Sequence, residues 1–408
     1  MKLIKKIISL VLVGVFSMQL VACSMFQNTF PQLDEIDSIL NEQSNVLQEN
    51  ADTEGNINQN MNSDIEMSEN LFDFTIKLDG TVLQLPCSSQ ELMDAGWDFY
   101  DADKNSMVAG ESYVHVYMNK GNKQILVYFY NMSGNACEIT NCKVGGVSIE
   151  VSDDISFELS KGINLESQID EIIAAYGVPS ERSTYDDFEI LDYRDNDSFY
   201  NRVKFTYYTE DEKKLYSSIE IKNFVETASD KTETNTQRPV YLDDYVRPTA
   251  LGTDLISGNI SIEGDVYHLP TPVSEFMDRG WTIVQQPGGI SSGNNDYIRL
   301  QKNDKELDVR VTNYAEYQTT AENCVVFSLY VNKDYSEIDL KIPNISFDST
   351  KEDVEKYVTD EFYRSENTDK YSYQYSEYKD RDFSLSISVD KETGKVSYIS
   401  IKDETWDY

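Results

Sequence analysis

Apolar and polar residues alternate in short runs over much of the chain, which is the pattern of β-strands with one buried face. The first such runs, 72–78 and 82–85, flank Asp79-Gly80, a dipeptide typical of a tight hairpin turn. Later alternating runs predict further strands at 112–118, 124–131 and 144–151, and a closing hairpin at 203–209 and 215–222. These runs predict a mainly antiparallel sheet.

Two segments have the spacing of helices. In residues 88–95, Ser88 and Glu91 fit a capping box, and Gly96 follows at the place where a left-handed residue ends many helices. Residues 165–176 place apolar side chains every three or four positions and are followed by Gly177. Strands in runs with only two helices favour an α+β fold.

A long internal repeat divides the chain. Residues 80–97 match residues 264–281 without a gap, and nine of the 18 positions are identical. A period of 184 residues is too long for a solenoid and predicts a duplicated domain. In the second copy, Thr271 and Pro272 are expected to supply the N-cap and first-turn signals of the helix.

Five segments follow from these patterns. Residues 24–70 are polar with few aromatics, so they cannot bury enough apolar surface to order, and we expect a tether there. We predict two tandem homologous α+β domains, each a mainly antiparallel sheet with about two helices. The predicted segments are a signal peptide (1–22), an acidic tether (23–70), repeat 1 (71–224), a linker (225–254) and repeat 2 (255–408).

The N-terminus predicts export. Met1–Lys6 is basic and Ile7–Leu20 is a short apolar run, as in a signal peptide. Leu20-Val21-Ala22-Cys23 resembles the lipobox of bacterial lipoproteins, which implies that the Cys23 thiol is lipidated and becomes the mature N-terminus. An ordinary secretory signal with an incidental cysteine is the alternative. Because two acyl chains anchor stably, we expect the protein on the extracytoplasmic face of the cell membrane.

The charge narrows the class of partner. The formal net charge is −37, and removal of Met1–Ala22 with its three lysines makes it −40. Such an acidic chain is not expected to bind nucleic acid or to adhere electrostatically to anionic lipid. The membrane, through the lipid on Cys23, and an envelope or extracellular protein are the partners that we expect.

Matching residues of the two copies have structural explanations. Trp97 and Trp281 are expected in the core, with ligand stacking as the alternative. Two carboxylate pairs, Glu91 with Asp94 and Glu275 with Asp278, have the spacing of acid/base groups, but a solvated acidic helix face is favoured.

The remaining chemical signals are weak. Cys142 and Cys324 are equivalent and predict small buried residues, whereas Cys137 is close enough to Cys142 in sequence for a local disulfide. The only histidines, His115 and His268, are not equivalent, which argues against histidine-assisted nucleophilic catalysis. An EF-hand-like start at 101–105 lacks the required glycine and glutamate, and Asp192, Asp195 and Asp197 indicate at most loose calcium binding. We therefore predict no catalytic residue, metal or cofactor.

One segment resembles a known type of module. Gly162–Ser180, followed by a hairpin, is similar to the small lipoprotein and inhibitor modules of the BamE and β-lactamase-inhibitor-protein type. In repeat 2, Asn344 replaces the first glycine and residues 360–362 replace the Gly-x-Pro turn. The Leu-Pro…Gly-Trp block resembles uncharacterised tandem-domain lipoproteins of Firmicutes. These resemblances imply non-catalytic binding at the cell surface, often of another protein.

The sequence therefore leaves two possible functions, which belong to different classes. The first is a membrane-anchored binding or scaffold protein of the cell envelope that is not an enzyme. The second is a cell-envelope hydrolase, which predicts a deep cleft lined by paired carboxylates with raised pKa values. A transporter's solute-binding lipoprotein would show alternating strands and helices, a pattern that this chain lacks.

Overall fold

The structure is a computed structural model, and it describes residues 65–408 except 102, 151–153, 211–212, 228–229, 379–381 and 407–408. The predicted signal peptide, Cys23 and most of the predicted tether lie outside the described residues. Among the residues that are described, no helix is long and apolar enough to cross a membrane.

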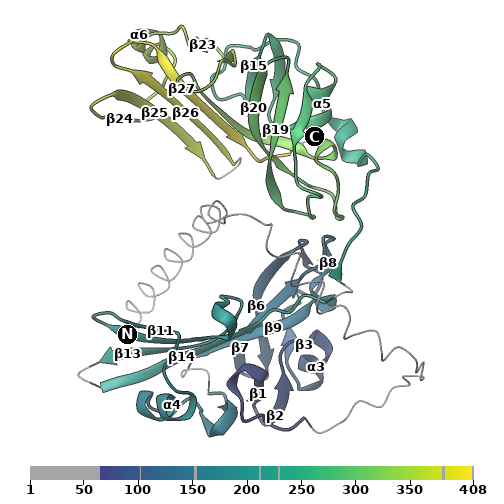
Figure 1. Ribbon diagram of the computed structural model, residues 1–408, viewed down its shortest axis with the longest axis vertical. Helices are drawn as coiled ribbons and strands as arrows, with labels where there is room; N and C mark the ends of the chain where they lie inside the picture. The colour runs from purple at the N-terminus through teal and green to yellow at the C-terminus, as the bar shows by residue number, and fades with distance from the viewer. Residues whose placement is uncertain are drawn as a thin grey trace, which may run out of the picture. The chain divides into compact units, whose positions relative to one another are not determined.

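The predicted α+β class is wrong, because the fold is mainly β. Strands make up 45% of the structure and helical turns 14% (Figure 1). The helices are short: α3 (Ser89–Asp94), α4 (Ile169–Tyr176), α5 (Val273–Met277) and α6 (Lys351–Glu355). The helix predicted at 165–176 loses its first turn because Gln168 forms the capping box with Glu171. Residues 181–194, to which we assigned no element, form two strands.

Repeat 1 is organised around a nine-stranded antiparallel sheet. Its order is β11-β12-β13-β14-β9-β7-β6-β4, with β3 paired to β9. These strands are β3 (Cys87–Ser88), β4 (Asp98–Phe99), β6 (Ser112–Lys120), β7 (Lys123–Asn131), β9 (Lys143–Glu150), β11 (Glu181–Thr184), β12 (Phe188–Arg194), β13 (Asn201–Glu210) and β14 (Lys213–Asn223).

Repeat 2 has the same strand order in its own nine-stranded sheet. The order is β24-β25-β26-β27-β21-β20-β19-β18, with β17 paired to β21. These strands are β17 (Thr271–Pro272), β18 (Thr282–Gln285), β19 (Asn295–Lys302), β20 (Lys305–Thr312), β21 (Val325–Asn332), β24 (Tyr363–Glu366), β25 (Lys370–Glu377), β26 (Phe383–Asp390) and β27 (Val396–Asp403). The matching order allows the two sheets to be compared position by position.

Smaller sheets complete each repeat. One has the order β10-β1-β2 and another the order β16-β15-β22-β23, while β5 pairs with β8. Their strands are β1 (Thr75–Leu78), β2 (Thr81–Gln84), β5 (Met107–Val108), β8 (Cys137–Glu138), β10 (Phe157–Glu158), β15 (Asn259–Ile262), β16 (Asp265–His268), β22 (Leu340–Ile342) and β23 (Ile345–Ser346).

Local sequence signals explain where repeat 1 turns. Asp79 and Gly80 have φ angles of 49° and 90° between β1 and β2, which confirms the predicted hairpin turn. The capping box of Ser88 and Glu91 begins α3, and Gly96, with φ of 92°, follows its end. In repeat 2 the prediction fails, because Thr271 and Pro272 form β17 and no side-chain hydrogen bond caps α5.

One face of each large sheet is buried in a hydrophobic core. The tryptophans that follow α3 and α5 are 1% exposed in both repeats, which confirms Trp97 and Trp281 as core residues. Along β13, Val203, Phe205 and Tyr207 point into this core, so the intervening side chains lie on the opposite face. We call that opposite side the outer face of the sheet.

Equivalent loops of the two repeats are joined by backbone hydrogen bonds. Gly110 N–H donates to the Ser292 carbonyl over 2.9 Å, and Ser292 N–H donates to the Gly134 carbonyl over 2.9 Å. Ala136 N–H donates to the Glu316 carbonyl over 2.8 Å. Gly110 and Ser292 are 182 residues apart, as are Gly134 and Glu316, so each loop meets its own counterpart.

Candidate functional site

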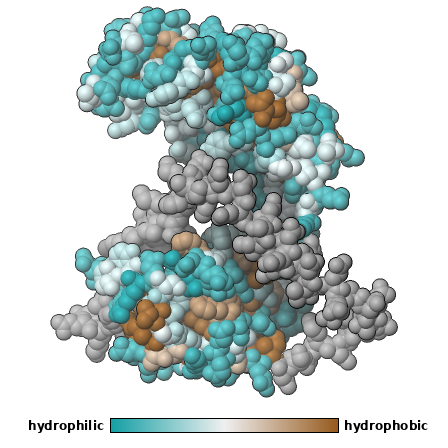
Figure 2. Space-filling view, in the orientation of Figure 1, coloured by the Kyte–Doolittle hydropathy of each residue, from teal (hydrophilic) through white to brown (hydrophobic). Residues whose placement is uncertain are grey.

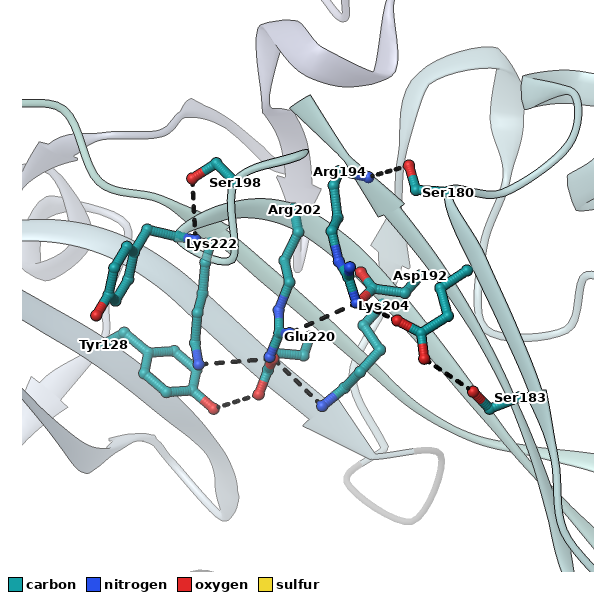
Figure 3. A network of polar contacts seen from close by, with 12 residues as sticks. Tyr128, Ser180, Ser183, Asp192, Arg194, Ser198, Arg202, Lys204, Glu220 and Lys222 are labelled. Carbon is teal, nitrogen blue, oxygen red and sulfur yellow. Dashed lines mark hydrogen bonds and ion pairs between the residues drawn. The ribbon is translucent and has the colours of Figure 1, made fainter. Parts of the chain in front are cut away.

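The outer face of the repeat 1 sheet carries a network of charged side chains on three adjacent strands. Strand β12 supplies Asp192 and Arg194, β13 supplies Arg202 and Lys204, and β14 supplies Glu220 and Lys222. Because alternate residues of a strand share a face and the register aligns the three strands, these six side chains are neighbours. We call them the ion network (Figure 3).

Glu220 is the centre of the ion network. Its Oε1 lies 2.7 Å from Arg202 Nη2, 3.3 Å from Lys204 Nζ and 3.6 Å from Lys222 Nζ. Its Oε2 accepts a hydrogen bond of 2.8 Å from the Tyr128 hydroxyl. Burial alone would raise the pKa of Glu220, but Lys204, Lys222 and Arg202 lower it well below its usual range. The carboxylate therefore stays ionised while three cations share it.

Asp192 forms the second centre of the ion network. Arg194 Nε donates to its Oδ2 over 2.9 Å, and Arg202 Nη1 lies 3.7 Å from the same oxygen. Arg194 also donates to Glu181 at the margin. Asp192 is only 4% exposed, and its Oδ1 has no hydrogen-bond partner among the described residues; the same is true of Arg202 Nε. Buried polar atoms without a partner are costly, so the network is not optimised for stability.

An aromatic cluster adjoins the ion network on the same face. Phe224 stacks on Tyr130 with ring centroids 4.8 Å apart and on Tyr200 at 5.8 Å, and Tyr113 lies 5.3 Å from it. The Lys222 ammonium joins the two groups, because it lies 4.3 Å from the centre of the Tyr128 ring. Tyr113 and Tyr200 are 42% and 48% exposed, so the cluster presents aromatic surface to solvent.

Gly145 makes room for this cluster. A Cβ at this position of β9 would lie 2.4 Å from a ring carbon of Phe224 and 2.5 Å from one of Tyr130. Any side chain at residue 145 would therefore displace these two rings. The residue at the corresponding position of β21, 182 residues later, is Phe327, which is fully buried beneath the guanidinium of Arg310.

Repeat 2 lacks both features at the matching positions. The register of its sheet aligns Asp192, Arg194, Arg202, Lys204 and Glu220 with Gln374, Ser376, Ser384, Ser386 and Ser400. Only Lys222 keeps its chemistry, as Lys402. The aromatic residues Tyr113, Tyr128, Tyr130 and Phe224 correspond to Asn295, Arg310, Thr312 and Glu404. The fold therefore does not require the ion network or the aromatic cluster.

Three comparisons with known proteins gave no match. No protein-family model, no curated protein and no solved structure matches the chain. The site must therefore be interpreted from its own geometry.

The carboxylates singled out in the sequence have local structural partners. Glu91 accepts hydrogen bonds from the backbone and hydroxyl of Ser88, and Asp94 accepts from Gln90. In repeat 2, Arg247 contacts both Glu275 and Asp278, at 2.7 and 3.3 Å. Glu275 has a side chain that is 14% exposed and also pairs with Arg279, so the expectation of a simply solvated helix face is wrong there.

Other residues singled out in the sequence lie apart or have different partners. His115 is on the outer face 6.0 Å from the Tyr128 ring, whereas His268 Nδ1 bonds to Asn259 in β15. Burial and Lys222 lower the pKa of His115. Asp192 is occupied by arginines, so it does not face Asp195 and Asp197 as a calcium ligand would; the latter two form a 3₁₀ turn. Within the described part of the chain, no group of three His, Cys, Asp or Glu side chains is placed to hold a metal.

One carboxylate pair bears on the hydrolase alternative. In repeat 2, Lys402 Nζ lies 3.2 Å from Asp382 and 3.2 Å from Glu404. Burial and a hydrogen bond with Asp382 raise the pKa of Glu404. However, two pockets of about 240 and 250 Å³ are lined by other residues, namely those around Tyr371 and those around Phe157. Asp382 and Glu404 line neither of these two pockets.

The sequence contains one signal for the ion network, and it lies in the positions where the two repeats differ. Its members alternate with core residues along 188–194 and 201–205, and they differ between the repeats. Comparison of the differing positions, instead of the identical ones, leads to this face.

Proposed function

We propose that this chain is a lipid-anchored, non-catalytic binding protein of the cell envelope, and that repeat 1 carries its binding surface. The surface is the outer face of the sheet, with the ion network and the aromatic cluster. The observation that carries the proposal is the contrast with repeat 2, where the same strands in the same register have serines at four of the six network positions. A feature that one repeat has and the shared fold does not need is best explained by recognition.

The composition of this face favours a protein partner. Tyrosine and arginine are the residues that dominate protein–protein binding energy, because they combine contact area with directed hydrogen bonds. Exposed Tyr113, Phe199 and Tyr200 lie beside Arg194 and Lys222, and the Arg194 guanidinium is 4.3 Å from the centre of the Phe199 ring. In the view of Figure 2 most of the described surface is hydrophilic, and hydrophobic residues form separate patches.

Site-specific crosslinking in intact cells tests the binding surface. In one full-length variant, a photoreactive amino acid replaces Tyr113. In the control it replaces Tyr297, which lies on β19, the strand of repeat 2 that matches β6. We expect a crosslinked protein of defined mass with the first variant and none with the second. Equal crosslinking at both positions, or none at either, would contradict the assignment.

Repeat 2 supplies a matched variant. Replacing Asp192, Arg194, Arg202, Lys204 and Glu220 by Gln, Ser, Ser, Ser and Ser gives repeat 1 the set that repeat 2 carries. We expect this variant to fold, as judged by its circular dichroism, and to lose the Tyr113 crosslink. A crosslink of unchanged yield would show that the ion network does not contribute to binding.

The anchor is tested separately. Cys23→Ala should release the protein from the membrane fraction into the medium and prevent incorporation of labelled fatty acid. Retention of Cys23→Ala in the membrane would contradict the lipid anchor without bearing on the binding face.

Hydrolysis is the alternative that we favour less, and its best observation is the raised pKa of Glu404. It predicts that Asp382→Asn or Glu404→Gln abolishes release of soluble fragments from purified cell-wall material. If the unmodified protein releases none, this alternative fails and the binding proposal is unaffected.

A further inference from the structure

We infer that Cys137 and Cys142 are a disulfide-forming pair, a modification site that only repeat 1 has. The two sulfur atoms lie 2.8 Å apart, while the thiols of Cys87 and Cys324 are buried separately in the cores. The inference does not depend on the proposed binding function.

The local backbone brings the two thiols together. Cys137 lies in β8, which pairs with β5 through Val108, and a 3₁₀ turn over Ile139–Asn141 returns the chain to Cys142. The Cys142 N–H closes this turn by donating to the Ile139 carbonyl over 3.1 Å, and Ile139 N–H donates to Ser106 over 2.9 Å. Both cysteines are thus positioned by backbone hydrogen bonds, so closure of the bond requires little rearrangement.

Repeat 2 contains the same turn without the pair. Thr319 and Cys324 are the counterparts of Cys137 and Cys142, 182 residues later. A 3₁₀ turn spans Ala321–Asn323, and the Cys324 thiol approaches the Thr320 carbonyl at 3.6 Å, much as the Cys142 thiol approaches the Glu138 carbonyl at 3.5 Å. The turn therefore forms without a disulfide. Cys137, whose counterpart in repeat 2 is Thr319, is not needed for the turn to fold.

Exposure sets the order of the chemical steps. Cys137 is partly exposed and Cys142 is 4% exposed, so Cys137 reacts first. Its thiolate attacks one sulfur of an external disulfide oxidant such as oxidised glutathione, forms a mixed disulfide and expels one thiolate. Cys142, as it loses its proton, attacks the Cys137 sulfur and expels the second thiolate. Two protein thiols are oxidised, one external disulfide is reduced, and the two protons end on the two glutathione thiols.

The Cys137–Cys142 disulfide would restrain a segment that also contacts repeat 2. Residues directly before Cys137 take part in the hydrogen bonds between the repeats, from Ala136 N–H to Glu316 and from Gln318 N–H to Asn135 Oδ1 over 2.9 Å. A link from β8 to the start of β9 restricts this segment in the unfolded chain as well as in the folded one.

Peptide mapping of the full chain tests the inference. Purified protein is incubated with oxidised glutathione, alkylated in denaturant without reductant, and digested with a protease that cleaves after glutamate. Because Glu138 separates the two cysteines, cleavage leaves them on different peptides unless a disulfide holds them together. We expect a linked pair that is two hydrogen atoms lighter than the sum of its peptides and that separates on reduction.

The controls make each outcome decisive. Cys137→Thr copies repeat 2 at this position, should fold, and should give no linked pair, with Cys142 alkylated instead. Alkylation of both cysteines in the oxidised protein, or a glutathione adduct that remains on Cys137, would overturn the inference. A link from Cys142 to Cys87 instead of Cys137 would overturn it as well.

Discussion

Repeats 1 and 2 share a sheet of the same strand order and differ on its outer face. In repeat 1, Glu220 is buried among three cations, and rings pack over Gly145. In repeat 2 the matching positions are Ser400 and Phe327, and the Phe327 ring is buried beneath the guanidinium of Arg310. The comparison separates what the fold requires from what one copy has added. The following experiments test that separation, and those expected to change stability most come first.

Truncation of Glu220 should have the largest effect. Glu220→Ala leaves the buried Lys222 and the partly buried Arg202 and Lys204 without their shared carboxylate, and loss of one partner from a buried ion pair costs about 3–5 kcal/mol of unfolding free energy. Ser400→Ala, the matched change in repeat 2, should stay within about 0.5 kcal/mol. Urea unfolding followed by hydrogen exchange in β14 and β27 measures both. Equal effects in the two strands would show that the ion network is not a special feature of repeat 1.

A methyl group at Gly145 should have the next largest effect. Gly145→Ala forces apart Phe224 and Tyr130, and overpacking of this kind costs about 1–3 kcal/mol. Ser148→Ala, on the same strand, is the control and should be close to neutral. Thermal unfolding measures the change, and a melting temperature that Gly145→Ala leaves unaltered would mean that the rings are not packed as described.

The pH dependence of stability should have opposite signs for Glu220 and Glu404. The folded pKa of Glu220 is lowered, so its stabilisation is complete above the unfolded pKa of about 4.3 and is lost as pH falls through the folded value. The folded pKa of Glu404 is raised, so its contribution is present below about pH 4.3 and is lost as pH rises through the folded value.

Two glutamine variants measure these signs. Relative to the unmodified protein, Glu220→Gln should lose more stability at neutral pH than in acid, and Glu404→Gln should lose more in acid than at neutral pH. Unfolding free energies collected between about pH 3 and 7, a range that contains the unfolded carboxyl pKa of about 4.3, provide the comparison. If both variants lose more stability at the same end of the pH range, the electrostatic contrast between Glu220 and Glu404 is wrong.

Exposed rings should matter least for stability. Tyr113→Ala removes a ring that is 42% exposed, and we expect a loss of about 1 kcal/mol or less, as for a partly exposed surface residue. When the photoreactive group is placed at a neighbouring position such as Tyr200, the Tyr113→Ala variant should nevertheless fail to crosslink the partner. A large loss of stability with full retention of the partner would make Tyr113 a structural residue.

The local parts of the fold were predictable because their signals are local. The turn at Asp79-Gly80 needs positive φ angles, the box of Ser88 and Glu91 satisfies free backbone groups, and Trp97 follows a helix-ending glycine. The fold class was not, because helices such as α5 are short, so that strands make up 45% of the structure and helical turns only 14%. Thr271 has the character of an N-cap, but pairing with Val326 in β21 holds it in a strand.

The candidate site was not predictable from spacing. Asp192 and Glu220 are 28 residues apart, and only the pairing of β12, β13 and β14 brings their partners together. Within each strand the alternating charges have the pattern of an ordinary solvated face. For the same reason we predicted no strand where β12 lies. Lipidation of Cys23 and a partner at the cell surface remain predictions of the sequence.

Because the two sheets share a register, the outer face of repeat 1 can be transplanted onto repeat 2. Because Gln374, Ser376, Ser384, Ser386 and Ser400 occupy the matching positions, the five network side chains can be grafted there without a change of backbone. The aromatic cluster would follow with Phe327→Gly and the corresponding ring substitutions. A chain that displays the face twice would be bivalent, and its avidity for a clustered partner would rise with no new type of contact. One ancestral sheet would then provide a two-site capture reagent.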